Sequence, residues 1–221
     1  MGYINKKRAH EFIIDLTEFK DINEFDAEAI KCKLGFPEES IVWITTGRIS
    51  SRKCVDVLLR VFRKIINDQS KSNVFFLVLG DGVLYEQFSK KYGNENIKFL
   101  GWVSNVEEYL AIADFFVSAS KSEGLPNSVL EAMGYGLPVL LSDIGPHMEI
   151  TSIASSEGRA IGSVFSLGNE KSCMEQVLAM HEMPYEKLSS EVKQVVNAHF
   201  SIEKLAENYN QFYAECVSNE S

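Results

Sequence analysis

The fold of this chain is predicted best from residues 115–136, which read FFVSASKSEGLPNSVLEAMGYG. The run opens with Phe115-Phe116-Val117, an apolar segment typical of a buried strand. Gly124 and Pro126 then interrupt the strand pattern. Apolar residues return at helical spacing, at Val129, Ala132 and Met133. The stretch therefore predicts a strand, a tight turn and a helix in direct succession.

The start of this helix is predicted to attract an anion. Asn127 or Ser128 could cap the helix, or Pro126 could be its first residue with Leu125 before it. In either arrangement the first backbone N–H groups have no partner within the helix, and the helix dipole places partial positive charge at that end. Phosphate groups bind at helix starts of this kind.

Two carboxylates border the same turn. Glu123 precedes it, and Glu131 lies in the second turn of the predicted helix, where side chains lean toward the helix start. Either glutamate alone would be expected to be solvated or to favour the helix dipole. Carboxylates are poor partners for phosphate but accept hydrogen bonds from hydroxyl groups. Together with the anion site, the pair favours a ligand with hydroxyl groups on both sides of its phosphates, as in a nucleotide-sugar.

Strand and helix patterns alternate along most of the chain. Apolar, β-branched runs predict strands at residues 41–46, 74–79, 97–100, 115–117, 137–141 and 164–165. Single helices between strands imply parallel pairing through right-handed crossovers. We therefore expect an α/β fold, with one doubly wound, Rossmann-like parallel sheet of about six strands and helices on both faces.

The predicted domain organisation is simple. Residues 1–40 are expected to form a hinge segment, with a helix at 27–34 ended by Gly35. Residues 41–183 are expected to form the Rossmann-like domain, and residues 184–221 its helical C-terminal tail.

Ligands of doubly wound sheets bind at the carboxyl ends of the strands, near the point where the strand order reverses. Three predicted loops leave strand ends there, at residues 47–53, 80–82 and 120–128. In the first loop Gly47 allows a sharp turn, and Arg48 and Lys53 can bracket a diphosphate.

The same loop weighs against one class of protein. It carries a single glycine, where a dinucleotide-binding oxidoreductase would carry Gly-x-Gly-x-x-Gly. The remaining cation of the loop, Arg52, is expected to be solvated.

Other residues at this edge are less specific. Gly80 and Gly82 could form only a tight turn, although small residues also let the backbone approach a ligand closely. Trp102 could flank a nucleobase or pack in the core. Residues 143–147 are expected to form a further loop. No partner can be assigned to His147 within it, so no catalytic role is predicted for this histidine.

Composition narrows the choice of partners. The 221 residues carry a formal net charge of −9, which argues against binding to nucleic acid. No apolar run approaches the length of a membrane span, and residues 1–10 lack a signal-peptide core, so we expect a cytoplasmic protein. No Cys-x-x-Cys pair is present, and the cysteines and histidines are scattered. This predicts reduced thiols and no metal site.

Several motifs follow one another along the chain: Gly47-Arg48 with Lys53, Gly80-Asp81-Gly82, Phe99-Leu100-Gly101, Ala113-Asp114, the paired-glutamate segment 120–133, and Gly136-Leu137-Pro138-Val139. In this order they resemble the carboxyl-terminal, donor-binding domain of GT-B glycosyltransferases of the retaining family four. The resemblance runs from about Ile14 to Tyr213. One such motif would be weak, but their succession is specific.

The resemblance implies a role for each matching position. Arg48 and Lys53 would hold the diphosphate of a nucleotide-sugar donor, Glu123 would contact the donor sugar as the catalytic residue, and Glu131 would bind the ribose hydroxyls. It implies no metal ion and no cofactor besides the donor substrate. The donor-binding residues predicted in this way are Gly47, Arg48, Lys53, Gly80, Gly82, Gly124, Leu125, Pro126, Asn127 and Glu131.

The sequence also departs from the family pattern. Cys54 stands where the family has Gly, and Phe12-Ile13 stands where Asn-Gly is usual. We find no counterpart of the amino-terminal, acceptor-binding domain, and the helix expected at 201–213 resembles the segment that packs on that domain. The 221-residue chain alone is therefore expected to bind a donor without transferring it, and to need an acceptor-binding domain, a partner chain or a homodimer.

Three hypotheses for function remain open at this stage. The first is a glycosyltransferase that acts in polysaccharide or glycolipid assembly. The second is a nucleotide-sugar-binding subunit that is not catalytic by itself. The third is a GT-B nucleotide-sugar epimerase, which the paired glutamates disfavour.

Overall fold

The computed structural model describes residues 15, 19–68, 73–204, 206–207 and 210. Within them, six strands form one parallel sheet: β1 (Ile41–Thr46), β2 (Val74–Leu79), β3 (Ile97–Gly101), β4 (Phe115–Ser118), β5 (Val139–Ser142) and β6 (Gly162–Phe165). Their order is β3-β2-β1-β4-β5-β6. The chain runs outward from β1 in one direction, then returns to place β4 on the other side of β1. The predicted doubly wound sheet is confirmed.

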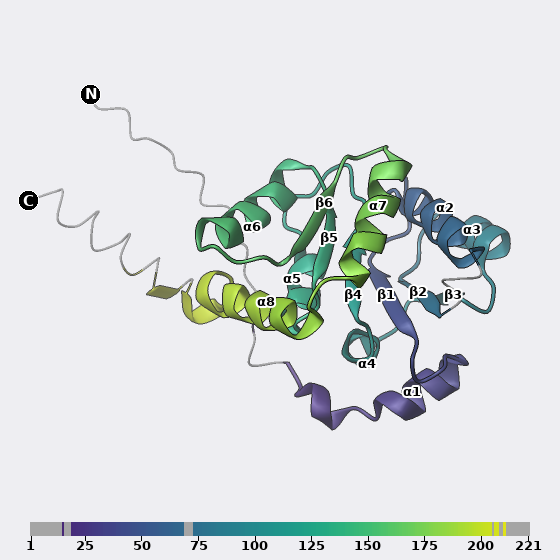
Figure 1. Ribbon diagram of the computed structural model, residues 1–221, viewed down its shortest axis with the longest axis horizontal. Helices are drawn as coiled ribbons and strands as arrows, with labels where there is room; N and C mark the ends of the chain where they lie inside the picture. The colour runs from purple at the N-terminus through teal and green to yellow at the C-terminus, as the bar shows by residue number, and fades with distance from the viewer. Residues whose placement is uncertain (1–14, 16–18, 69–72, 205, 208–209, 211–221) are drawn as a thin grey trace, which may run out of the picture.

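Helices cover both faces of the sheet (Figure 1). One face packs against α2 (Val55–Ile66), α3 (Tyr85–Tyr92) and α7 (Glu170–His181). The other face packs against α1 (Ala27–Leu34), α4 (Val106–Ala111), α5 (Asn127–Gly134), α6 (Gly145–Ser156) and α8 (Tyr185–His199). A short 3-10 helix, η2 (Ile22–Glu24), precedes α1. The result is three layers, with apolar side chains on each side of the central sheet.

The central strand β1 shows why the layers form. Val42 and Ile44 point into one apolar cluster, whereas Trp43 points into the other, as the two-residue period of a strand requires. All three side chains are fully buried. The Trp43 ring stacks on Phe115 of β4, and its indole nitrogen Nε1 donates to His181 at the end of α7 over 2.8 Å. A buried tryptophan thus keeps its one polar group satisfied.

The pairing of β1 with its two neighbours is unequal. β1 and β2 stay in register over six residues, from Ile41 with Val74 to Thr46 with Leu79. β1 and β4 pair at two positions, Trp43 with Phe115 and Ile44 with Phe116. The last two residues of β1 therefore extend past the pairing with β4, at the edge where the strand order reverses.

Two sequence predictions about elements require correction. Residues 143–147 do not form a loop, because Gly145 and Pro146 begin helix α6 and His147 lies buried in its first turn. The apolar period of this helix is masked by Thr and Ser residues, whose hydroxyls donate back to main-chain carbonyls of the helix. β5 begins at Val139 rather than Leu137, because Pro138 has no N–H to donate to a strand ladder.

The segments outside the sheet follow the prediction closely. Helix α1 ends at Gly35, which adopts the left-handed conformation with φ of 75°, and Phe36 then packs on Phe75 in the core. The described start of the predicted tail is helical, since α8 follows Pro184 directly and runs from Tyr185 to His199. The boundaries at residues 40 and 183 stay predictions. The hinge residues Phe12-Ile13 lie outside the described residues, as do residues 205, 208–209 and 211–213 of the helix expected at 201–213.

Asp114 joins β4 to β1 at the amino ends of the strands. Its backbone N–H donates to the Val42 carbonyl over 2.8 Å, and its Oδ2 accepts the Val42 N–H over 2.7 Å. Burial raises the pKa of the Asp114 carboxyl, against the opposing effects of the Val42 hydrogen bond and the Lys31 charge. This member of the Ala113-Asp114 motif therefore has a structural explanation.

Asp114 should make stability depend on pH. Because its pKa is higher in the folded than in the unfolded state, the free-energy penalty is present at neutral pH and disappears as pH falls through the folded pKa. We expect Asp114→Ala to destabilise by about 2 kcal/mol, since the buried Val42 N–H loses its partner, and Asp114→Asn to cost less. On acidification the wild type should gain free energy of unfolding relative to Asp114→Asn. Urea titrations at pH 7 and 4.5 measure this, and a relative loss for the wild type would contradict it.

Candidate functional site

A cavity of about 620 Å³ lies at the edge where the strand order reverses. The loops after β1 and β4 line it, and the turns after β2 and β3 add further lining residues. Eight of the residues predicted for the site line this cavity: Gly47, Arg48, Lys53, Gly80, Glu123, Leu125, Asn127 and Glu131. The topology therefore gathers predicted residues that lie up to 84 positions apart in the sequence, from Gly47 to Glu131.

The loop after β1 brings three cations to the cavity. Arg48 is exposed there, whereas the Lys53 side chain is only 15% exposed and its Nζ lies 2.6 Å from Glu123 Oε1. Arg52 was expected to be a solvated residue without a role. It instead lines the cavity, donates to the Ser122 carbonyl over 3.4 Å, and lies 3.8 Å from Glu123 Oε2.

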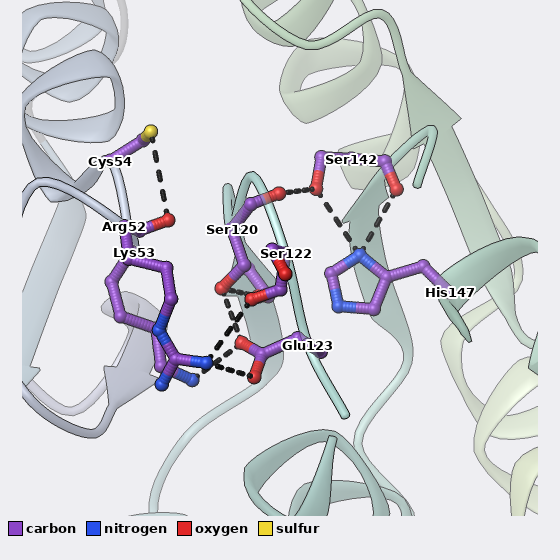
Figure 2. Close-up of polar contacts among 9 residues, drawn as sticks. Arg52, Lys53, Cys54, Ser120, Ser122, Glu123, Ser142 and His147 are labelled. Atoms are coloured by element: carbon purple, nitrogen blue, oxygen red, sulfur yellow. Dashed lines mark hydrogen bonds and ion pairs between the residues drawn. The ribbon is translucent and has the colours of Figure 1, made fainter. Parts of the chain in front are cut away.

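Glu123 is the most enclosed charged group of the cavity, with a side chain 6% exposed. Figure 2 shows Lys53 and Arg52 reaching its carboxylate from the loop after β1. Ser120 Oγ donates to Oε1 over 2.5 Å. Burial opposes ionisation of Glu123, but the hydrogen bonds from Lys53 and Ser120 outweigh it, so its pKa is lowered. Lys53 and Glu123, which were predicted to hold different parts of a donor, thus form an ion pair with each other.

Gly80 and Gly82 do not both face the cavity. Gly80 lines it, but Gly82 does not, and each has a positive φ, 119° and 157°. A Cβ atom on Gly80 would lie 2.0 Å from the Gly47 carbonyl oxygen, and one on Gly82 would lie 2.4 Å from the Ile49 oxygen. These glycines let the turn after β2 pack on the loop after β1. The close approach is between two loops of the protein.

The start of α5 differs from both predicted caps. Pro126 is the N-cap residue, Asn127 is the first helical residue, and no side chain caps the helix. Because Asn127 is not used as a cap, its side chain is available to the cavity that it lines. Gly124 and Pro126 do not line the cavity, and Pro126 is buried beneath the turn.

Glu131 lies one turn further along α5 and borders the same cavity. Its carboxylate is accessible, yet the surrounding protein partly desolvates it, and this raises its pKa. The two glutamates therefore differ in environment: Glu123 is held ionised by a lysine and a serine, whereas desolvation disfavours the ionised form of Glu131.

Apolar side chains form the remaining wall. Val103 and Val106 come from the segment after β3, and Leu125 comes from the turn before α5. Trp102 also lines the cavity and is 75% exposed, which contradicts a role in core packing. A large exposed indole beside a polar cavity is suited to stacking on a flat ring.

Cys54 closes the loop after β1. It is the only non-glycine residue with positive φ in the described part of the chain, at 47°, and it stands at the N-cap of α2. Its buried Sγ donates to the Ser51 carbonyl over 3.4 Å. The left-handed conformation explains why glycine suits this position in the related motif.

Sequence reasoning missed several residues of the site. Asp81, Val103, Val106 and Ser128 line the cavity, and each lies within a few residues of a predicted strand end or helix start. This closeness to a strand end or a helix start was the only sign in the sequence that they line the site. Ser120 was quoted as part of the central stretch, but its bond to Glu123 depends on the turn geometry, which the sequence alone does not reveal.

Within the described residues, no group of three or more His, Cys, Asp or Glu side chains could hold a metal ion. Among the same residues, no helix is both long enough and apolar enough to cross a membrane.

The doubly wound sheet, with its cavity at the switch point, places this chain among Rossmann-like α/β domains of the type that forms one half of a GT-B fold. The chain belongs to the family described as glycosyl transferases group 1, whose model matches residues 26–198. This confirms the resemblance drawn from the motifs.

Individual relatives agree with this assignment. The chain is 32% identical over 138 residues to an Escherichia coli UDP-Gal:alpha-D-GlcNAc-diphosphoundecaprenol alpha-1,3-galactosyltransferase, covering 59% of this chain and 35% of that protein. It is 24% identical over 220 residues to the alpha-monoglucosyldiacylglycerol synthase of Streptococcus pneumoniae, covering 96% and 48%. The Anabaena HepE structure in complex with UDP-glucose superposes with a TM-score of 0.68 at 20% identity, covering 91% and 56%.

The chain matches only part of each relative. It spans about half the length, or less, of the curated relatives that it matches: 27% of a Methanocaldococcus jannaschii protein and 48% of the Streptococcus pneumoniae synthase. The matched part of the HepE structure is likewise about half of that chain, 56%.

Proposed function

We propose that this chain is the donor-binding half of a glycosyltransferase that moves a sugar from a nucleoside diphosphate to a polysaccharide or glycolipid acceptor. One observation carries the proposal. A single cavity holds cations on its β1 side, carboxylates on its β4 and α5 side, and an apolar wall. A nucleotide-sugar needs those three environments for its diphosphate, its hydroxyl groups and its base.

The diphosphate is assigned to the loop after β1 and the start of α5. Arg48 offers a planar guanidinium, Lys53 a compact ammonium, and the start of α5, which no side chain caps, offers the partial positive charge of the helix dipole. These positive groups would stabilise the charge that develops on the diphosphate as the sugar leaves. Lys53 must then divide its contacts between phosphate and Glu123, to which it is bonded without ligand.

The hydroxyl groups are assigned to the two glutamates. Glu131 would accept hydrogen bonds from the ribose, with the base extending toward Trp102 and Val106. Glu123 would contact the transferred sugar and act as the catalytic residue. Because a carboxylate accepts from two hydroxyls, each position can fix the orientation of one ring.

The acceptor is assigned only by chemical class. Two relatives are named for transfer to a lipid-linked sugar and for synthesis of a glycolipid. An acceptor-binding domain, supplied elsewhere in the protein or by a partner chain, would complete the active site. By itself the 221-residue chain would bind donor without transferring it at an enzymatic rate, because holding both reactants together supplies up to roughly 7–11 kcal/mol of a barrier.

The two glutamates should separate in binding experiments. Loss of a hydrogen bond to a charged group is worth about 1.5–3 kcal/mol, or about tenfold or more in affinity. We expect Glu131→Gln to weaken UDP or GDP by that factor. Glu123→Gln should not weaken the free diphosphate, because it releases Lys53, but should weaken the intact nucleotide-sugar. Isothermal titration calorimetry measures both.

The control is Glu149→Gln, an exposed carboxylate on α6 outside the cavity, which should leave both affinities unchanged. If no nucleoside diphosphate binds at millimolar concentration, the proposed function is wrong. If both cavity variants weaken both ligands equally, the assignment of the two carboxylates is wrong.

A further inference from the structure

A buried chain of polar groups extends from the cavity into the protein. Ser142, the last residue of β5, is fully buried, and its hydroxyl donates to the Ser120 carbonyl over 2.8 Å. Ser120 is fully buried as well and donates its own hydroxyl to Glu123. The main chain at the start of the turn that carries Glu123 is therefore attached to the neighbouring strand.

His147 continues this chain into helix α6. Its ring is fully buried, with Nδ1 3.0 Å from the Ser142 carbonyl oxygen and 3.2 Å from Ser142 Oγ (Figure 2). A carbonyl oxygen only accepts, so Nδ1 carries the hydrogen and donates. Burial lowers the pKa of His147 and keeps this neutral tautomer at physiological pH.

The direction of every bond is then fixed. Nδ1 of His147 donates to Ser142, the Ser142 hydroxyl donates to the Ser120 carbonyl, and the Ser120 hydroxyl donates to Glu123. The one hydrogen on Nδ1 is shared between the Ser142 carbonyl oxygen at 3.0 Å and the Ser142 hydroxyl oxygen at 3.2 Å, and both oxygens can accept it. A buried network in which the direction of every donor is fixed is rigid.

The opposite nitrogen of His147 shows that the ring is not optimal for stability. Its Nε2 is buried and has no hydrogen-bond partner among the described residues. A buried acceptor without a partner costs free energy, and a leucine of similar volume would avoid that cost. The imidazole is therefore better explained by the contacts of Nδ1 than by packing.

The network has its largest effect on the position of Glu123 when Lys53 turns toward a diphosphate. Among the described residues, Ser120 is then the one partner within 3 Å of the Glu123 carboxylate, because Arg52 lies 3.8 Å away. The position of Ser120 is set by Ser142, and that of the Ser142 hydroxyl by His147. A carboxylate that loses its cation can keep its place only through such supports.

We propose that Ser142 and His147 are positioning residues, which hold the turn from Ser120 to Glu123 so that the Glu123 carboxylate meets the donor sugar. The contact between Glu123 and the donor sugar rests on the proposed function. The positioning itself does not, because it can be measured without any ligand.

The test uses Ser142→Ala, His147→Leu and His147→Asn. Asparagine keeps an N–H donor near the place of Nδ1, whereas leucine removes it. The ligand-free readout is a ¹³C NMR titration of the Glu123 carboxylate. We expect its midpoint to rise by about half a pH unit in Ser142→Ala and His147→Leu, because the hydrogen bond from Ser120 weakens, and to return toward the wild-type value in His147→Asn. Ser152→Ala, an exposed serine on the same helix, is the matched control and should leave it unchanged.

Calorimetry supplies the second readout. Ser142→Ala and His147→Leu should weaken a nucleotide-sugar about fivefold or more, while the free nucleoside diphosphate stays within about twofold. An unchanged Glu123 titration in both variants, or equal loss of both ligands, would overturn the proposal. If His147→Leu fails to fold, Ser142→Ala decides the matter. If the wild type binds neither ligand but the titration shifts, the proposed function fails and the positioning stands.

Discussion

Gly80→Ala is expected to destabilise the protein by about 4 kcal/mol, from backbone strain and overpacking together. The new Cβ would lie 2.0 Å from the Gly47 carbonyl oxygen, a main-chain atom that cannot move as a flexible side chain would. The residue would also have to adopt a φ of 119°, which side chains rarely tolerate. Relief requires the loop after β1 to shift, and this would also displace Arg48 and Lys53. Thermal and urea unfolding measure the loss.

Gly124→Ala is the matched control, because a Cβ at this position would meet no atom within 4 Å and the φ of Gly124 is not positive. It should change the free energy of unfolding by less than about 0.5 kcal/mol. If Gly80→Ala were equally mild, the contact between the two loops would not be a constraint on the fold.

Lys53→Met should be the second large change, with a loss of about 3 kcal/mol in the free energy of unfolding. It leaves the Glu123 carboxylate, 6% exposed, without its lysine, and an uncompensated buried charge is costly. The pKa of Glu123 is depressed in the folded state, so the ion pair stabilises above the unfolded pKa and this stability is lost as pH falls through the folded pKa. The difference between variant and wild type should therefore be largest at neutral pH and shrink in acid.

Two comparisons make this result specific. Lys53→Met combined with Glu123→Gln should recover most of the stability, because the unpaired charge is gone. Arg52→Met is the matched control. Its side chain is 55% exposed and its Nη1 lies 3.8 Å from Glu123 Oε2, so its loss should cost about 1 kcal/mol or less. Equal losses from the two single variants would contradict the special status of the Lys53 pair.

The parts of the fold with strong local signals were predictable from sequence. The strand at Val74–Leu79 is apolar at every position and was placed correctly to the residue. Helix α6 was not predicted, because Thr and Ser dilute the apolar period that identifies a helix. The same omission made His147 look like a loop residue without a partner, whereas its partner is Ser142, five positions before it in the chain.

The candidate site was likewise predictable only in part. The alternation of strands and helices predicts the strand order, and the strand order decides which loops meet at the cavity. Eight of the lining residues could therefore be foreseen. The pairing of Lys53 with Glu123 could not, because it depends on the distance between two loops 70 positions apart. Gly80 illustrates the limit most clearly: its small size was explained by a tight turn or by the approach of a ligand, and the atom that a Cβ there would meet is a carbonyl oxygen of the protein itself.

The unequal pairing of β1 explains how such a site can diversify. Because β1 and β4 pair at only two positions, the backbone itself separates above Ile44 and opens the cavity there. The opening is produced by the backbone of the sheet. The side chains that would discriminate among sugars and bases lie on loops outside the paired strands. Substitutions in those loops can therefore alter substrate choice without repacking the sheet, which makes this architecture evolvable at its edge while its centre stays fixed.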